Sequence, residues 1–235
     1  ARMGVKPDAG LLEAMQRRAT ATAGDFDSEE VASFVWALAK MGNKPDAGLL
    51  EAMQRRATAT AGDFNPPDVG NLMWGLASMG IKPEAGLLEA MQRRATATAG
   101  DFDSEEVASF VWALAKMGNK PDAGLLEALQ QQATATAGDF KPHDVANLMW
   151  GLGKMGVTPD AGLMKAMQRR AIATAGNFKP QGVAMLMWAF AKMDITPDAD
   201  LVKAMQGQAM ATAGDFKPQN IANCMWALAT MELRP

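Results

Sequence analysis

The sequence predicts an all-α protein, a right-handed α-solenoid of helix-turn-helix pairs with a 38-residue repeat. Two observations lead to this prediction: a proline recurs every 38 residues, and a tryptophan follows each of the first six repeat prolines after 29 positions. A fixed period of about 20 to 50 residues is typical of stacked repeats, in which each unit buries its apolar face against its neighbours. The prolines are Pro7, Pro45, Pro83, Pro121, Pro159, Pro197 and Pro235, and the tryptophans are Trp36, Trp74, Trp112, Trp150, Trp188 and Trp226.

The period also sets the expected domain organisation of the 235 residues. Residues 1–6 align with the end of a preceding repeat, and residue 235 opens a further one, so we expect a fragment of a longer protein. The six complete repeats are predicted at 7–44, 45–82, 83–120, 121–158, 159–196 and 197–234.

Within a repeat, the first element is predicted to be an amphipathic helix. In repeat 1 it starts after Asp8, which can cap its N-terminus, runs from Gly10 toward Ala23 and stops at Gly24. Apolar side chains fall on one face at helical spacing, and charged ones fall on the other. This helix therefore has one face to bury against its neighbours.

The second element is predicted to be a helix with a strong N-terminal signature. Asp27 and Glu30 form a capping-box pattern, while Phe26 and Val31 occupy the two positions of a hydrophobic staple. In repeats 4 to 6 a Lys-Pro pair takes the place of the cap, and its proline suits the first helical position. Gly42 is placed to end the helix.

Composition excludes several classes of function. One histidine, His143, and one cysteine, Cys224, cannot supply a metal site or a catalytic set, so we expect no enzyme activity, no metal and no cofactor. Residues 151–156 match G-x-G-x-x-G, but they lie inside and at the end of a predicted helix, so the match is rejected. The absence of an apolar run of about 18 residues argues against membrane insertion. A net charge of −3 and a pI near 5.3 argue against indiscriminate nucleic-acid binding.

Comparison of the repeats singles out four variable columns on the second helix. Residues 30, 33, 37 and 40 of repeat 1, with their equivalents, are expected to form an exposed row opposite the core stripe. Short polar side chains, a small residue and a cation recur along it, an order that suits a reader of single-stranded RNA. A merely solvated face, or a protein-binding solenoid, would share this pattern. The base-reading candidates are Glu30, Ser33, Asp68, Asn71, Glu106, Ser109, Asp144, Asn147, Met185, Asn220 and Asn223.

Basic residues supply candidates for phosphate contacts. Repeat 5 carries five Lys/Arg against two Asp/Glu, a net charge of +3, whereas each of the other five repeats is net negative. Arg17, Arg55 and Arg93 are expected instead to pair with glutamates four residues earlier on the same helix. The phosphate-contact candidates are Lys40, Lys116, Lys154, Lys165, Arg169, Arg170, Lys179 and Lys192.

The chain resembles the octotricopeptide repeats of green algae over its whole length. The marks are the 38-residue period, the Phe-Lys-Pro-Gln openings at 178–181 and 216–219, and the Asn-Leu-Met-Trp core of the second helix at 147–150. The resemblance implies an organellar RNA-binding protein, chloroplast ahead of mitochondrion, that acts in transcript maturation, stability or translation. The Asp-Ser-Glu-Glu openings at 27–30 and 103–106 depart from the family pattern and add negative charge.

The functional hypothesis is therefore a modular binder of single-stranded RNA that uses one helix row per repeat, with about one nucleotide per repeat. Its expected partner is an organellar transcript, with protein partners besides and no DNA. The alternative is a protein-interaction or structural scaffold, for example an organellar ribosome component that contacts rRNA by shape.

Overall fold

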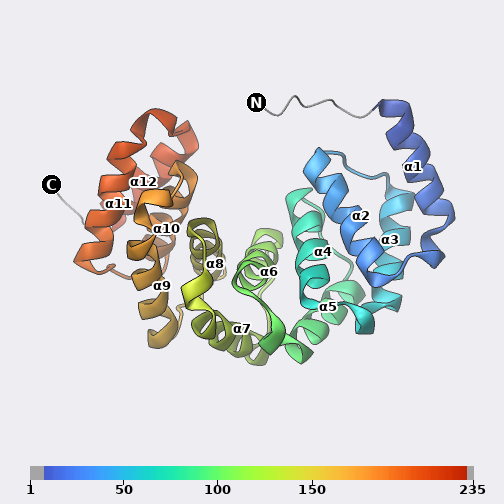
Figure 1. Ribbon diagram of the computed structural model, residues 1–235, viewed down its shortest axis with the longest axis horizontal. Helices are drawn as coiled ribbons and strands as arrows, with labels where there is room; N and C mark the ends of the chain where they lie inside the picture. The colour runs from blue at the N-terminus through green and yellow to red at the C-terminus, as the bar shows by residue number, and fades with distance from the viewer. Residues whose placement is uncertain (1–7, 232–235) are drawn as a thin grey trace. The chain divides into compact units, whose positions relative to one another are not determined.

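The computed structural model describes residues 8–231, and this span forms twelve α-helices and six short 3₁₀ turns. The partial repeats expected at residues 1–6 and at residue 235 lie outside the described residues. Along the described chain, two α-helices with a 3₁₀ turn between them recur at 38-residue intervals (Figure 1).

The helices fall into two sets according to their place in the repeat. The first helices are α1 (Ala9–Ala21), α3 (Ala47–Ala59), α5 (Ala85–Ala97), α7 (Ala123–Ala135), α9 (Ala161–Ala173) and α11 (Ala199–Ala211). The second helices are α2 (Ser28–Met41), α4 (Pro66–Ser78), α6 (Ser104–Met117), α8 (Pro142–Lys154), α10 (Pro180–Lys192) and α12 (Pro218–Thr230). The 3₁₀ turns are Ala23–Asp25, Ala61–Asp63, Ala99–Asp101, Ala137–Asp139, Ala175–Asn177 and Ala213–Asp215.

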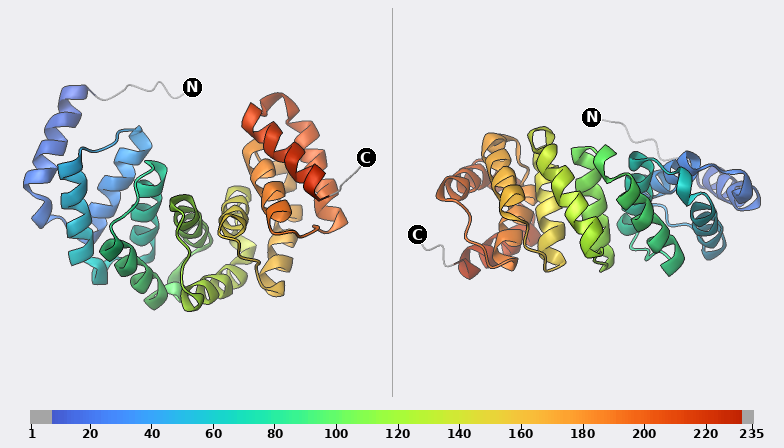
Figure 2. Two further views of the ribbon diagram at one scale, coloured as in Figure 1. Left: turned by 180° about the vertical axis from the view of Figure 1, so that it is seen from behind. Right: turned by 90° about the horizontal axis from the view of Figure 1, so that it is seen from below.

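The chain divides into two compact units between Arg94 and Ala95, and α5 spans this boundary. In the N-terminal unit, α1 packs on α3 and α2 packs on α4. In the C-terminal unit, first helices pack in the succession α7, α9, α11 and second helices in the succession α6, α8, α10, α12 (Figure 2). Each unit is thus a two-layer stack of helix pairs, and the predicted all-α solenoid class is confirmed.

The helix ends follow the local sequence signals. The Asp27 side chain accepts from the Glu30 backbone N–H at 2.8 Å while Glu30 accepts from the Asp27 N–H at 2.9 Å, so the predicted capping box is confirmed. The first helix ends at Ala21, earlier than the predicted Ala23, because the chain tightens there into a 3₁₀ turn. Gly42 adopts a left-handed conformation with φ of 67° at the C-cap of α2, as its role as helix stop requires.

The core lies between the two helix layers and is closely packed. The phenylalanine that precedes the second helix is at most 1% exposed in repeats 2 to 5, at Phe64, Phe102, Phe140 and Phe178. Second helices approach one another through small residues: a Cβ built on Gly151 of α8 would lie 2.9 Å from Val111 Cγ1 of α6. Column 37 denotes residue 37 of repeat 1 and the equivalent residue of each other repeat, and the other columns are named in the same way. This column was expected to be exposed, but it lies in the contact between helices, and Ala113 and Ala189 are both 0% exposed.

A recurring hydrogen bond ties each repeat to the one before it. The second residue of the Arg-Arg pair, or the Gln in its place, donates to the carbonyl of the phenylalanine 30 residues earlier. Arg170 Nε lies 2.5 Å from Phe140 O, and Gln132 Nε2 lies 2.5 Å from Phe102 O. The donor–carbonyl pairs are Arg56–Phe26, Arg94–Phe64, Gln132–Phe102, Arg170–Phe140 and Gln208–Phe178. Because the donor can be Arg or Gln, this bond needs an N–H and not a charge.

Candidate nucleic-acid interface

The surface left open on the second helices is a narrow row, which we call the second-helix strip. It comprises residues 29, 33, 36 and 40 of repeat 1 and their equivalents, spaced four, three and four residues apart on one helix face. Columns 29 and 40 are exposed in all six repeats, and columns 33 and 36 are exposed or half-buried. The strip therefore shares only columns 33 and 40 with the row expected from the sequence.

Column 30 corrects that expectation most clearly. Asp68 is 5% exposed and Asp144 is 1% exposed, because α4 packs against α2 and α8 packs against α6. Glu30 and Glu106 cap the backbone of their own helices, through Asp27 and Asp103 respectively. In column 30, the carboxylates of repeats 1 and 3 therefore cap their helices, and those of repeats 2 and 4 are buried.

Column 33 remains at the surface as expected, with short polar side chains in every repeat except repeat 5, where Met185 takes their place. Asn71, Ser109, Asn147, Met185 and Asn223 are half-buried, and Ser33 is exposed. Within residues 8–231, the side-chain amide of Asn147 has no hydrogen-bond partner. That amide can donate and accept at once, which is what recognition of a base edge requires.

The tryptophans lie on the strip beside column 33, a placement that was not predicted from the sequence. In the C-terminal unit Trp112, Trp150, Trp188 and Trp226 follow one another with ring centroids 6.4, 6.2 and 6.2 Å apart and interplanar angles of 35° to 38°. They form a continuous aromatic column along the four second helices. The sequence signal for this placement was that each tryptophan follows the column 33 residue by three positions, a spacing that puts both on the same helix face.

The lysines of column 40 follow the tryptophans by one helical turn. In the N-terminal unit the Lys40 ammonium lies 5.1 Å from the Trp36 ring centroid and 4.4 Å from that of Trp74, as a cation–π pair with each. Lys116, Lys154 and Lys192 of the C-terminal unit are exposed and make no ion pair within the described residues. These three charges are available to a ligand.

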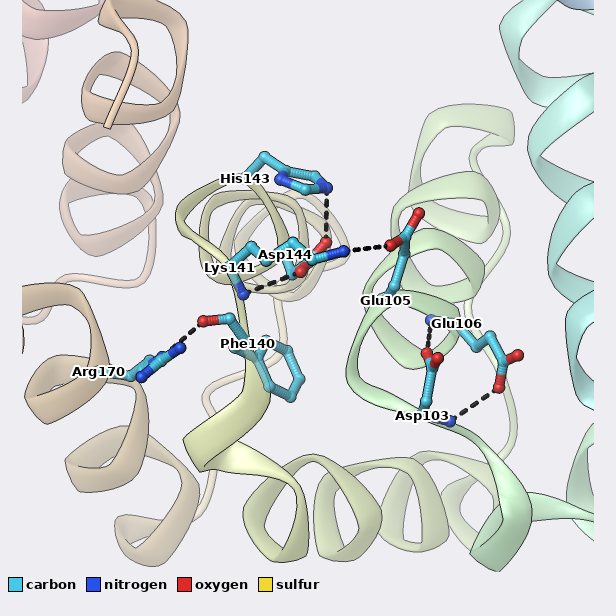
Figure 3. Close-up of polar contacts among 8 residues, drawn as sticks. All are labelled: Asp103, Glu105, Glu106, Phe140, Lys141, His143, Asp144 and Arg170. Atoms are coloured by element: carbon cyan, nitrogen blue, oxygen red, sulfur yellow. Dashed lines mark hydrogen bonds and ion pairs between the residues drawn. The ribbon is translucent and has the colours of Figure 1, made fainter. Parts of the chain in front are cut away.

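The remaining basic candidates have other surroundings. Lys165 and Arg169 are exposed on α9, a first helix, and so belong to the other layer. Arg170 is half-buried with its Nε donating to Phe140 (Figure 3), whereas Lys179 is exposed at the N-cap of α10. Arg17, Arg55 and Arg93 pair with Glu13, Glu51 and Glu89 at 3.0, 3.5 and 3.8 Å, which confirms the predicted intrahelical pairs.

A cluster of charged groups surrounds the N-terminus of α8 (Figure 3). Asp144 Oδ2 accepts from the Lys141 backbone N–H at 3.0 Å, and its Oδ1 lies 2.9 Å from His143 Nε2. Burial raises the pKa of the Asp144 carboxyl, and the backbone hydrogen bond and His143 lower it less. Lys141 reaches across to Glu105 of α6 at 2.9 Å, and this hydrogen-bonded ion pair raises the pKa of the lysine.

Other reactive groups in the described chain have no partners for chemistry. Cys224 is half-buried, and burial raises the pKa of its thiol to about 11, so it stays protonated at neutral pH. No group of three or more His, Cys, Asp or Glu within residues 8–231 is placed to hold a metal ion. Over the same residues, none of the helices has both the length and the apolar character needed to cross a membrane.

A cleft of about 410 Å³ opens beside the strip between the N-terminal ends of α8 and α10. His143 and Asn147 come from α8, and Gln181, Gly182 and Met185 come from α10. Both helices belong to the C-terminal unit. The cleft joins columns 29 and 33 of two successive repeats.

Fold and surface together define a helical-repeat protein with a polar and aromatic strip along its second helices. A protein-family model described as RNA-editing substrate-binding complex 6 protein (RESC6) matches residues 1–235, and the chain belongs to this family. The comparison with curated proteins gave no match. A helical-repeat protein of an RNA-related family is thus shown, whereas the octotricopeptide assignment stays a prediction.

Proposed function

We propose that this chain binds single-stranded RNA along the second-helix strip and does so as a component of an RNA-processing assembly. One observation carries the proposal: in the C-terminal unit a continuous tryptophan column has a half-buried row on one side, polar at all positions but Met185, and three unpaired lysines on the other. The description of the family, an RNA-editing substrate-binding complex protein, supports both an RNA ligand and protein partners.

The chemistry of the three columns suits an extended strand. Tryptophan edges and faces offer contact area to bases, and stacking of a base on an aromatic side chain contributes about 1 to 3 kcal/mol. Column 33 holds three side-chain types in this unit, Ser109, Met185 and the pair Asn147 and Asn223, so base preference can differ between repeats that carry different types. The lysines of column 40 supply positive charge to the phosphates at one-repeat intervals.

The role proposed is binding and not catalysis. The organellar location, chloroplast ahead of mitochondrion, belongs to the proposal and rests on the octotricopeptide resemblance alone. The base-reading role proposed here falls on column 33, since column 30 is buried or engaged in caps in repeats 1 to 4.

The test is removal of the strip lysines by K116Q/K154Q/K192Q, with binding to a fluorescent single-stranded RNA measured by anisotropy at several salt concentrations. Each phosphate contact on a single strand contributes about 0.7 to the slope of log K against log salt, so the slope should fall by about 2. The matched control is K44Q/K120Q/K203Q, which removes three exposed charges outside the strip.

Equal losses in the two triple variants would show that net charge, and not the strip, governs binding. A wild-type chain that retains no RNA at low salt would overturn the proposal and favour the scaffold alternative. Loss of RNA binding in K165Q/R169Q alone would place the RNA on the first-helix layer instead.

A further inference from the structure

Gly182 lines the cleft between α8 and α10 without adding a side chain to it. Column 30 carries a carboxylate in repeats 1 to 4 and an amide in repeat 6, but a glycine in repeat 5. A Cβ built on Gly182 would lie 3.2 Å from the Phe178 ring and 3.8 Å from Ala146 Cβ, and all three residues line the cleft. Any larger side chain at this position would occupy the floor of the cleft.

The walls of the cleft combine apolar surface with side-chain amides that make few hydrogen bonds within the described residues. Pro142, Ala146 and Met185 supply apolar surface. Asn147 has no side-chain hydrogen bond within residues 8–231, and the Gln181 amide has only a long contact of 3.7 Å to the Met185 sulfur. Amides in this condition can pair with a ligand that offers a donor beside an acceptor.

The size and the charge of the cleft restrict that ligand further. A cleft of about 410 Å³ falls within the range of about 300 to 1,000 Å³ that is usual for small-ligand sites. Its lining residues include Lys179 and no carboxylate, and repeat 5 carries the net charge of +3. A planar base that has a polar edge and is joined to a phosphate meets all of these conditions.

We infer that this cleft takes up one nucleobase of the bound RNA strand, turned out of the row along the tryptophans. Asn147 and Gln181 contact the polar edge of the base, the Met185 and Pro142 side chains pack on its faces, and Lys179 lies near its phosphate. The inference rests on the proposed function, because it assumes that the strand runs along the second-helix strip. It makes the junction of repeats 4 and 5 the strongest single point of contact.

The test fills the cleft by Gly182→Asn and Gly182→Asp, which add the same bulk without and with a charge. Both variants restore residue types already present in column 30, and the Asp can accept from the Lys179 backbone N–H as Asp144 does from Lys141, so the fold should persist. Circular dichroism and thermal unfolding verify this. Both variants should weaken binding of the single-stranded RNA about tenfold, the loss expected for one base contact.

The control is Asn220→Asp, which adds a negative charge to the same column of repeat 6, away from the cleft. It should change the affinity less than about twofold. If Gly182→Asn binds as well as the wild type, no base enters the cleft and the inference is wrong. A loss in Gly182→Asp that Asn220→Asp reproduces, with none in Gly182→Asn, would show a charge effect only and would also overturn it.

A second measurement separates this inference from the proposed function. The four nucleoside 5′-monophosphates are titrated into the 235-residue chain while NMR follows the Met185 methyl and Asn147 side-chain amide signals. Shifts at both groups that Gly182→Asn abolishes support the cleft even if the strip lysines prove irrelevant to RNA. Strip-dependent RNA binding, with no shift at either group and no effect of Gly182→Asn, would keep the proposed function and discard the cleft.

Discussion

Repeats 4 and 5 have the same two helices and the same tryptophan, yet they differ at the helix contact and at the start of the second helix. Repeat 4 has Gly151 at the helix contact and a buried Asp144 at the start of its second helix. Repeat 5 has Ala189 and Gly182 at those positions, and it exchanges a negative net charge for +3. The same pair of helices can therefore hold a buried carboxylate in one repeat and a glycine that lines a cleft in the next.

The largest effect is expected where repeat 4 packs most closely. Gly151→Val places a branched side chain where even a Cβ would lie 2.9 Å from Val111 Cγ1 and 3.1 Å from Val111 O. Overpacking against a backbone atom should lower the free energy of unfolding by about 2 to 3 kcal/mol, measured by urea denaturation. The control is Gly138→Val, where a Cβ meets nothing within 4 Å. Equal losses in the two variants would show that close packing at Gly151 does not matter.

A smaller effect is expected at the bond that joins the two repeats. Arg170→Ala leaves the Phe140 carbonyl without its side-chain donor and should cost about 1 to 2 kcal/mol of unfolding free energy. Arg170→Gln should cost less than about 0.5 kcal/mol, because Gln132 and Gln208 make the same bond at their own junctions. Chemical denaturation of the two variants measures the difference.

The same pair of variants sharpens the phosphate assignment of Arg170. If Arg170→Gln keeps its stability and its RNA affinity, the arginine is structural and leaves the set of phosphate-contact candidates. If the stability is kept but the affinity falls, the guanidinium serves both the junction and a phosphate.

The smallest effect concerns the carboxylate that repeat 5 lacks. Burial raises the pKa of Asp144, so the folded chain binds this proton more tightly than the unfolded chain, whose Asp pKa is about 3.9. The resulting contribution to stability is present below that value and is lost as the pH rises through the folded pKa. Asp144→Asn keeps an acceptor for the Lys141 N–H and should raise the unfolding free energy at pH 7 by up to about 1 kcal/mol.

The pH dependence of that gain is its check. Thermal unfolding at pH 7 and at pH 3 should show the gain of Asp144→Asn at the higher pH only. A gain of equal size at both values would mean that the amide acts through hydrogen bonding and not through the missing charge.

The sequence predicted the helices, their caps and the repeat-to-repeat stacking because those features depend on local chemistry that every repeat restates. An Asp followed three residues later by a Glu is a local signal for a capping box, and Asp27 and Glu30 form one in the structure. The exposed row was predicted wrongly at column 37, and at column 30 in repeats 2 and 4, because helical periodicity identifies one buried face only. A second helix of this fold is covered by the first-helix layer and also by the second helices beside it, so the open surface is narrower than the polar face.

The candidate site illustrates the same limit. Column 37 consists of Ala and Gly because neighbouring helices touch there, but small residues on a helix look the same whether they face solvent or a close contact. Trp150 and its equivalents are apolar and so resemble core residues in the sequence, although their rings follow one another along the surface. The cleft at Gly182 is lined by residues of two successive repeats, and the sequence alone does not show that they meet around this glycine.

The hydrogen bond that spans 30 residues has a consequence for how such an array can change over evolutionary time. At each junction the phenylalanine carbonyl of one repeat accepts from an Arg or Gln side chain of the next. Repeats can therefore follow one another in any order and keep this hydrogen bond. Insertion or deletion of whole 38-residue segments therefore leaves every junction chemically intact. The identity of residues 27–43 with residues 103–119 is what such recombination would leave behind. Under the proposed function, the length of RNA that the array can bind would grow or shrink by whole repeats while the fold stays the same.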